Sequence, residues 1–348
     1  MSPAITPAVA VAPARPGRPA LLAGLAVLTA AAVAGLLVGP AGIDAGQALL
    51  ALADALPGVG MDYRLTEVEM RVLFDIRLPR VVMGGVVGAV LALAGAAYQG
   101  VFRNPLADPY LLGVAAGAGL GATLAFAWSG TEALVALFAL LGGLAAVVVT
   151  YTLGRSVGGR TTTSLILAGV AVAAFATAIQ TYVLQRHVES IREVYSWILG
   201  RLITVGWGEV LGLAPYAAVS GLVLIGSRRL LDVLALGDDE AAALGVRVPV
   251  VRWVLVTAAT LATAAAVSVS GLIGFVGIIV PHTIRILFGW SYRVIVPLSV
   301  LFGAAFLVAA DLAARTLVAP GELPIGVVTA FFGAPFFLLV LRTIRRAP

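Results

Sequence analysis

The sequence predicts an all-α integral membrane protein with about ten transmembrane helices. Hydrophobic residues make up 61% of the 348 residues and charged residues only 11%, whereas soluble domains carry roughly 25% charged residues. The mean hydropathy is +1.07. A helix needs about 20 apolar residues to cross a bilayer, and the chain contains ten apolar runs near that length.

The ten predicted spans follow one another along almost the whole chain. The longest uncharged stretch, between Arg252 and Arg285, exceeds one bilayer crossing, so we divide it at Ser270-Gly271. In chain order the spans are Pro19–Val38, Val81–Phe102, Tyr110–Trp128, Ala133–Leu153, Ser164–Leu184, Val210–Gly226, Trp253–Ser270, Gly274–Phe288, Val294–Leu312 and Leu323–Leu341.

The first 18 residues are rich in Pro and Ala and carry Arg15 and Arg18. We expect residues 1–18 to form a disordered cytoplasmic tail. The run that follows is too long for the hydrophobic region of a signal peptide, which predicts a retained first helix.

Charge distribution predicts the orientation. All 22 basic residues are arginines, and placing the N-terminus in the cytoplasm puts 14 of them inside and eight outside. Because basic residues are enriched in cytoplasmic loops, we expect a multi-pass protein of the cell membrane with both termini in the cytoplasm. The pI near 10.0 then reflects arginines that orient the protein in the membrane rather than a nucleic-acid-binding surface.

Several classes of chemistry have no support in the sequence. The chain has neither cysteine nor lysine, which excludes thiolate sites, Schiff bases and a P-loop lysine. Its two histidines, His187 and His282, are far apart, and no catalytic motif is present. The sequence therefore predicts no catalytic, cofactor or metal site.

The polar insert 103–109 separates the second and third spans. Its two prolines forbid a continuous helix through it. The chain must therefore cross the membrane, turn sharply on a specific polar loop and cross back.

A cytoplasmic segment, 227–252, contains a second distinctive element. Residues 236–246 predict a short helix, with Asp238 near its N-cap and Gly245 near its C-terminal end. A simple linker would not need this helix, so the segment resembles a docking surface.

Few polar residues fall within the spans. Gln99, His282 and Arg285 lie late in their spans, and Asp311 and Arg315 are spaced for an ion pair within one helix. No span has an acidic residue at its centre. Carriers coupled to protons or sodium usually need such groups, which indicates that transport energy comes from elsewhere.

The sequence resembles the FecCD-type permeases, which are membrane subunits of type II ABC importers. The resemblance runs from about Arg77 to Leu341, and its motifs occur in the family's order. They are Arg77-Leu78-Pro79-Arg80, the turn 103–109 followed by Leu111-Leu112-Gly113, Leu165-Ile166-Leu167-Ala168-Gly169-Val170-Ala171, Gly274-Phe275-Val276-Gly277 with Pro281-His282-Thr283-Ile284-Arg285, and Glu322-Leu323-Pro324-Ile325-Gly326-Val327-Val328-Thr329 with Gly333-Ala334-Pro335.

The resemblance implies an architecture and a set of partners. Residues 19–348 would form one polytopic permease domain, with 227–252 as its cytoplasmic coupling segment. Two copies would enclose a central pathway, with two cytoplasmic ATP-binding subunits and an extracytoplasmic substrate-binding protein. The subunit itself would be a transport component rather than an enzyme, with no cofactor of its own.

The resemblance also assigns roles to three groups of residues. Docking of the binding protein falls to Arg77, Arg80 and Arg315. The cytoplasmic gate comprises Asn104, Leu106, Thr162 and Thr163. Coupling to the ATPase falls to Asp238, Asp239, Glu240 and Gly245. The resemblance implies no role for Arg103.

The family imports iron–siderophore complexes, haem and cobalamin. We favour an iron–siderophore complex as the metal-chelate cargo, with cobalamin or haem as the alternative. A proton- or sodium-coupled secondary carrier and a membrane enzyme are more distant alternatives, because the sequence lacks a coupling-ion site and a catalytic cluster.

Overall fold

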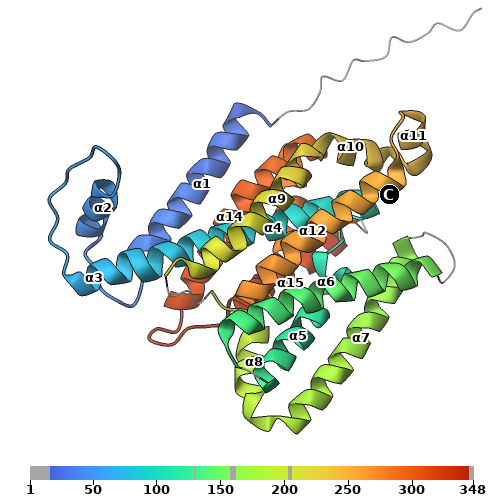
Figure 1. Ribbon diagram of the computed structural model, residues 1–348. Coiled ribbons are helices and arrows are strands. Elements are labelled where there is room, and N and C mark those ends of the chain that lie inside the picture. Colours follow the sequence, from blue (N-terminus) through green and yellow to red (C-terminus); the bar gives the residue numbers. More distant parts are fainter. Residues whose placement is uncertain (1–15, 129, 157–161, 203–205, 345–348) are drawn as a thin grey trace, which may run out of the picture.

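The computed structural model describes residues 16–128, 130–156, 162–202 and 206–344, and every regular element within these ranges is a helix (Figure 1). The predicted all-α class is confirmed. Seven helices are long and apolar enough to cross a membrane, and three shorter apolar helices accompany them. Each of the ten overlaps one predicted run, while the number that cross the membrane stays a prediction.

The long helices are α1 (Arg18–Leu37), α4 (Leu78–Phe102), α6 (Glu132–Ser156), α7 (Thr162–Arg186), α9 (Gly208–Gly226), α12 (Val248–Ser270) and α14 (Tyr292–Thr316). The three shorter apolar helices are α5 (Val114–Trp128), α13 (Val276–Phe288) and α15 (Ile325–Ile344). The remaining helices are α2 (Ala45–Asp54), α3 (Glu67–Arg71), α8 (Ile191–Ile198), α10 (Arg228–Leu236) and α11 (Asp238–Ala243).

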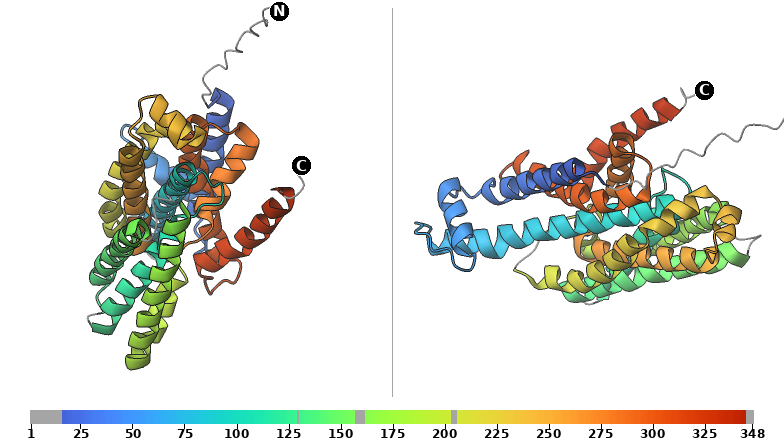
Figure 2. Two further views of the ribbon diagram at one scale, coloured as in Figure 1. Left: turned by 90° about the vertical axis from the view of Figure 1, so that its right-hand side faces the viewer. Right: turned by 90° about the horizontal axis from the view of Figure 1, so that it is seen from above.

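Helix α4 occupies the centre of the bundle (Figures 1 and 2). It packs against α9, α12, α13 and α14, and most of its residues are buried. A π-helical turn, Val72–Arg77, joins it to α3, so that Glu67–Phe102 forms one helical rod of 36 residues. A capping box at Thr66 and Glu69 fixes the start of this rod.

Two glycines allow other helices to approach α4 closely. A Cβ on Gly88 would lie 2.2 Å from the carbonyl oxygen of Gly303 in α14. A Cβ on Gly95 would lie 2.0 Å from the carbonyl oxygen of Gly277 in α13. Small residues permit this backbone contact.

Replacing Gly95 with alanine is expected to lower the free energy of unfolding by about 2–3 kcal/mol, because α4 and α13 must separate to admit the methyl group. Gly85→Ala is the matched control on the same helix, since its Cβ would lie 3.9 Å from the Cβ of Ala304, an ordinary contact. Denaturant unfolding of both purified variants measures the difference. Equal stability of the two variants would contradict the close α4–α13 contact.

Several helix boundaries differ from those predicted. The predicted boundary between two helices at Ser270-Gly271 is confirmed, because α12 ends at Ser270. The third run does not begin as an α-helix at Tyr110: Pro109–Leu112 forms a 3₁₀ turn before α5. Arg18 belongs to α1 rather than to the preceding tail, and residues 1–15 lie outside the described residues.

The bundle has two distinct ends, which we call the α2 end and the α11 end (Figure 1). Helix α1 runs toward the α2 end, and α15 runs toward the α11 end (Figures 1 and 2). The first residue of α1 and the last of α15 therefore both lie away from α2.

Candidate functional site

The polar insert forms a tight turn at the end of α4. Arg103 adopts a left-handed conformation with φ 51°, which ends the helix. The backbone N–H of Asn104 donates to the carbonyl of Gln99 at 3.1 Å, and the side chain of Asn104 accepts from the N–H of Leu106 at 3.0 Å. The predicted sharp turn is confirmed, and Asn104 holds it by an Asx-type bond.

Asp108 closes the other side of this turn. Its carboxylate accepts from the backbone N–H of Tyr110 at 2.7 Å. Burial raises the pKa of Asp108 to about 6, although the hydrogen bond from Tyr110 favours the charged form. The hydroxyl of Tyr110 donates to the carbonyl of Ile273 at 3.0 Å, which ties the turn to the segment between α12 and α13.

Helix α7 lies next to this turn. It packs against Pro109–Leu112, where a Cβ on Gly169 would lie 2.1 Å from the carbonyl oxygen of Leu111. This contact is several residues away from the predicted gate residues on both segments. Thr163 is exposed in the first turn of α7. Thr162 begins α7, and its side chain lies outside the described residues.

The short helix α11 confirms the predicted helix near Asp238. It begins at Asp238, and Gly245 follows its C-terminal end with φ 81°. Asp239, Glu240 and Gly245 are exposed, whereas Ala241 is buried beneath them. The helix therefore presents charged residues outward at its end of the bundle.

An ion-pair cluster links α11 to the turn. The guanidinium of Arg252 donates to Asp238 at 2.8 Å, and the guanidinium of Arg103 lies 3.5 Å from the same carboxylate. The family resemblance implies no role for Arg103. Arg103 and Asp238 are far apart in the chain, and no local pattern in either segment indicates their pairing.

A second contact anchors α10 to α14. Asp232 accepts from the hydroxyl of Ser291 at 2.8 Å and from the backbone N–H of Tyr292 at 2.6 Å. The coupling segment is thus fixed to the start of a central helix as well as to the turn.

The α2 end holds an arginine–carboxylate cluster. Arg80 binds Asp311 through its Nε at 3.0 Å and Glu322 through its Nη2 at 2.9 Å. Arg315 lies 3.0 Å from Asp311, which confirms the expected pair within one helix. Glu322 is the exposed member, because 42% of its side chain is accessible.

Arg77 and Arg315 also cap the C-terminal end of α1. Arg77 donates to the carbonyls of Leu36, Leu37 and Ala41, and Arg315 donates to the carbonyl of Gly35 at 3.0 Å. Cations stabilise helix C-termini. Only 3% of Arg77 and 4% of Arg315 is exposed, so these two predicted docking residues are engaged inside the subunit.

The polar residues near the α13 terminus form a buried network. Arg285 donates to the side-chain oxygen of Gln99 at 3.0 Å, and Gln99 donates to the carbonyl of Gly277 at 3.1 Å. The guanidinium also lies 5.5 Å from the ring centroid of Trp290. His282 packs edge-on against Phe336, which indicates a structural role for these side chains.

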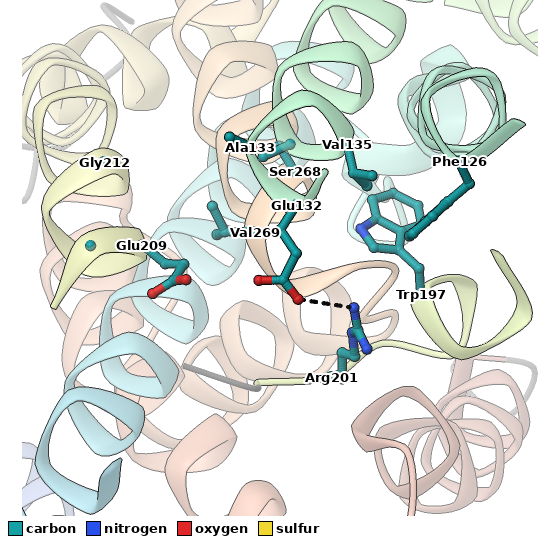
Figure 3. A pocket seen from close by; sticks show the side chains of 12 residues that line it. Phe126, Glu132, Ala133, Val135, Trp197, Arg201, Glu209, Gly212, Ser268 and Val269 are labelled. Carbon is teal, nitrogen blue, oxygen red and sulfur yellow. Dashed lines mark ion pairs between the residues drawn. The ribbon is translucent and has the colours of Figure 1, made fainter. Parts of the chain in front are cut away.

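A pocket of about 370 Å³ lies between α6, α8 and α9 (Figure 3). The carboxylates of Glu132 and Glu209 face the same space, and Arg201 lies 4.0 Å from Glu132. Phe126 and Trp197 form an apolar wall. None of the predicted gate, docking or coupling residues lines this pocket. Among the described residues, no group of three or more histidines and acids could hold a metal ion.

Comparisons with known proteins show the family to which the chain belongs. The sequence matches the FecCD transport family over residues 26–343. It is 40% identical to the cobalamin import system permease protein of Halobacterium salinarum, over 84% of this chain and 78% of that protein. It is 38% identical to the iron(3+)-hydroxamate import system permease protein of Bacillus subtilis, over 94% of this chain and 83% of that protein.

Two further similarities concern haem and the solved structures. The chain is 40% identical to the hemin transport system permease protein of Yersinia pestis, over 77% of this chain and 82% of that protein. A solved structure described as an inward-facing conformation of a metal-chelate type ABC transporter matches with a TM-score of 0.80 and 29% identity. That match covers 93% of this chain and 99% of the solved chain.

Proposed function

The chain belongs to the FecCD transport family and is an ABC importer permease, and we propose that it moves an iron–siderophore complex across the cell membrane. Cobalamin or haem is the alternative cargo. The observation that supports this choice is the match to the hydroxamate permease over 94% of this chain. The cobalamin and hemin permeases, each 40% identical over 84% and 77% of this chain, support the alternative.

The proposed assembly contains two copies of this chain, two cytoplasmic ATP-binding subunits and an extracytoplasmic substrate-binding protein. In this assembly ten helices cross the membrane and both termini are cytoplasmic. The ten apolar helices support this arrangement. The start of α1 and the end of α15 also support it, because both lie away from α2. The α11 end would then face the cytoplasm.

Coupling to ATP hydrolysis is proposed to act through α11. Its exposed Asp239, Glu240 and Gly245 suit a contact with the ATP-binding subunit. Asp238 connects that surface to Arg103 and hence to the turn that contains Asn104 and Leu106. A displacement of α11 would therefore reach the proposed gate through the ion pair of Asp238 with Arg103. Thr162 and Thr163 would form the opposite side of this gate.

Docking of the binding protein is proposed to occur at the α2 end. Within this cluster Arg80 and Arg315 share two carboxylates, Asp311 and Glu322, while Arg77 binds backbone carbonyls. An acidic group of the binding protein could replace the exposed Glu322 at Arg80. Arg77 and Arg315 would support this surface by holding α1 in place. Complementary charges of this kind orient partners and speed association.

The proposed function is tested by reconstituting the permease with its ATP-binding subunits and binding protein in liposomes. Uptake of a ferric hydroxamate, haem and cobalamin is then compared in the presence and absence of ATP. We expect ATP-dependent uptake of the ferric siderophore to exceed that of the other two. Preference for cobalamin or haem would select the alternative cargo. Uptake driven by a proton or sodium gradient without ATP would overturn the proposal.

A further inference from the structure

Two cavities meet on the surface of the bundle between α6 and α12. The larger, of about 600 Å³, lies beside α11, and the smaller, of about 250 Å³, continues along the two long helices. Tyr151 and Trp253 line both cavities. Their rings meet edge to face, with centroids 6.4 Å apart. The two cavities therefore adjoin at this aromatic pair, and we call them together the groove.

The larger cavity is basic. Arg247 and Arg252 line it together with Asp238, which gives a net charge of +1. Arg252 uses its Nη2 to bind Asp238, but its buried Nε has no hydrogen-bond partner. Arg247 is exposed. The cavity therefore retains hydrogen-bonding capacity for an anion.

The smaller cavity is apolar along most of its length. Val147 and Val148 of α6 face Val256, Thr257 and Thr260 of α12 across it. Val148 is 63% exposed, so the groove is open along the side of the bundle. A hydrocarbon chain fits the chemistry of this wall, whereas an extended peptide backbone would leave its polar groups unpaired there.

We propose that this groove binds one anionic phospholipid. Its phosphate lies at Arg247 and Arg252, its glycerol region lies beside Tyr151 and Trp253, and one acyl chain follows the wall between Val148 and Val256. Basic pockets between transmembrane helices bind anionic head groups, and aromatic side chains favour the membrane–water interface. The lipid would belong to the cytoplasmic leaflet. This orientation rests on the proposed function, whereas the binding itself does not.

The position of the phosphate has a consequence for α11. Arg252 would contact both the lipid phosphate and Asp238, and Asp238 lies within 3.5 Å of Arg103. The lipid phosphate would therefore add a negative charge to a cluster in which two arginines, Arg103 and Arg252, share the carboxylate of Asp238. It would hold α11 against α12 rather than displace it.

Lipid binding is tested on the full-length purified protein by native mass spectrometry. The probes are phosphatidylglycerol and phosphatidylcholine with identical palmitoyl and oleoyl chains. We expect tighter binding of phosphatidylglycerol. Arg247→Gln is expected to weaken phosphatidylglycerol binding about five-fold and to leave phosphatidylcholine binding unchanged. Val148→Trp, which fills the apolar wall, is expected to weaken binding of both lipids.

Two matched controls separate this site from general lipid contact. Arg229→Gln removes an exposed charge from α10, and Leu222→Trp changes an exposed apolar residue of α9; neither residue lines the groove. Neither control should alter lipid binding. Equal binding of the two lipids, or an unchanged affinity in Arg247→Gln, would overturn the inference. A protein that transports no metal chelate but retains this lipid preference would refute only the proposed function.

Discussion

Replacing Asp311 with asparagine is expected to lower the free energy of unfolding by about 3–5 kcal/mol. Asp311 is 1% exposed and contacts two arginines, Arg80 and Arg315, at 2.9 and 3.0 Å. The substitution leaves both guanidinium groups buried with one charge fewer between them. Arg315 would retain only its bond to the carbonyl of Gly35. Without Asp311 to position its guanidinium, Arg315 would hold this bond to α1 less firmly, so a weaker attachment of α1 should accompany the loss of stability.

Glu322→Gln is the matched control for this prediction. Glu322 binds the same guanidinium of Arg80 at 2.9 Å, but 42% of its side chain is exposed. Solvent screens such a pair, so its removal should cost no more than about 1 kcal/mol. Denaturant unfolding of the purified protein measures both values. A smaller loss in Asp311→Asn than in Glu322→Gln would contradict the buried position of Asp311.

Reversing the charge of Asp238 is expected to reduce cargo-stimulated ATP hydrolysis by the assembled importer about ten-fold. Asp238→Arg would place a fourth cation among Arg103, Arg252 and Arg247, and repulsion would move α11 away from α12. Hydrolysis by the reconstituted complex is measured with and without cargo-loaded binding protein.

A charge exchange tests whether the ion pair itself matters. Asp238→Arg combined with Arg252→Asp restores the shorter of the two pairs with its polarity reversed. We expect partial recovery of stimulated hydrolysis, because α11 regains its contact with α12. Normal stimulation in the single variant Asp238→Arg would contradict the coupling role of this cluster.

The apolar helices could be predicted from the sequence, because the length and hydropathy of each apolar run determine them. The polar turn at 103–109 followed from its prolines, and the break after Ser270 followed from the length of a bilayer crossing. The 3₁₀ turn before α5 was missed, because the apolar run continues through it without a change in composition.

The contacts between distant segments could not be predicted in the same way. Arg80 and Asp311 are 231 residues apart, and no spacing rule connects them. The family resemblance indicated Arg77 and Arg315 but not their burial, since exposure depends on how α1 packs. The pairing of Arg103 with Asp238 likewise depends on a tertiary contact at the α11 end.

The unbroken rod Glu67–Phe102 joins the two functional ends of the molecule. At about 1.5 Å per residue, its 36 residues extend for roughly 54 Å. Arg77 and Arg80 lie in its first half, and its last residue precedes Arg103. The close contacts of Gly88 and Gly95 lie between them and restrict sliding. We therefore expect the rod to move as one body about these contacts, so that a displacement at one end is transmitted to the other.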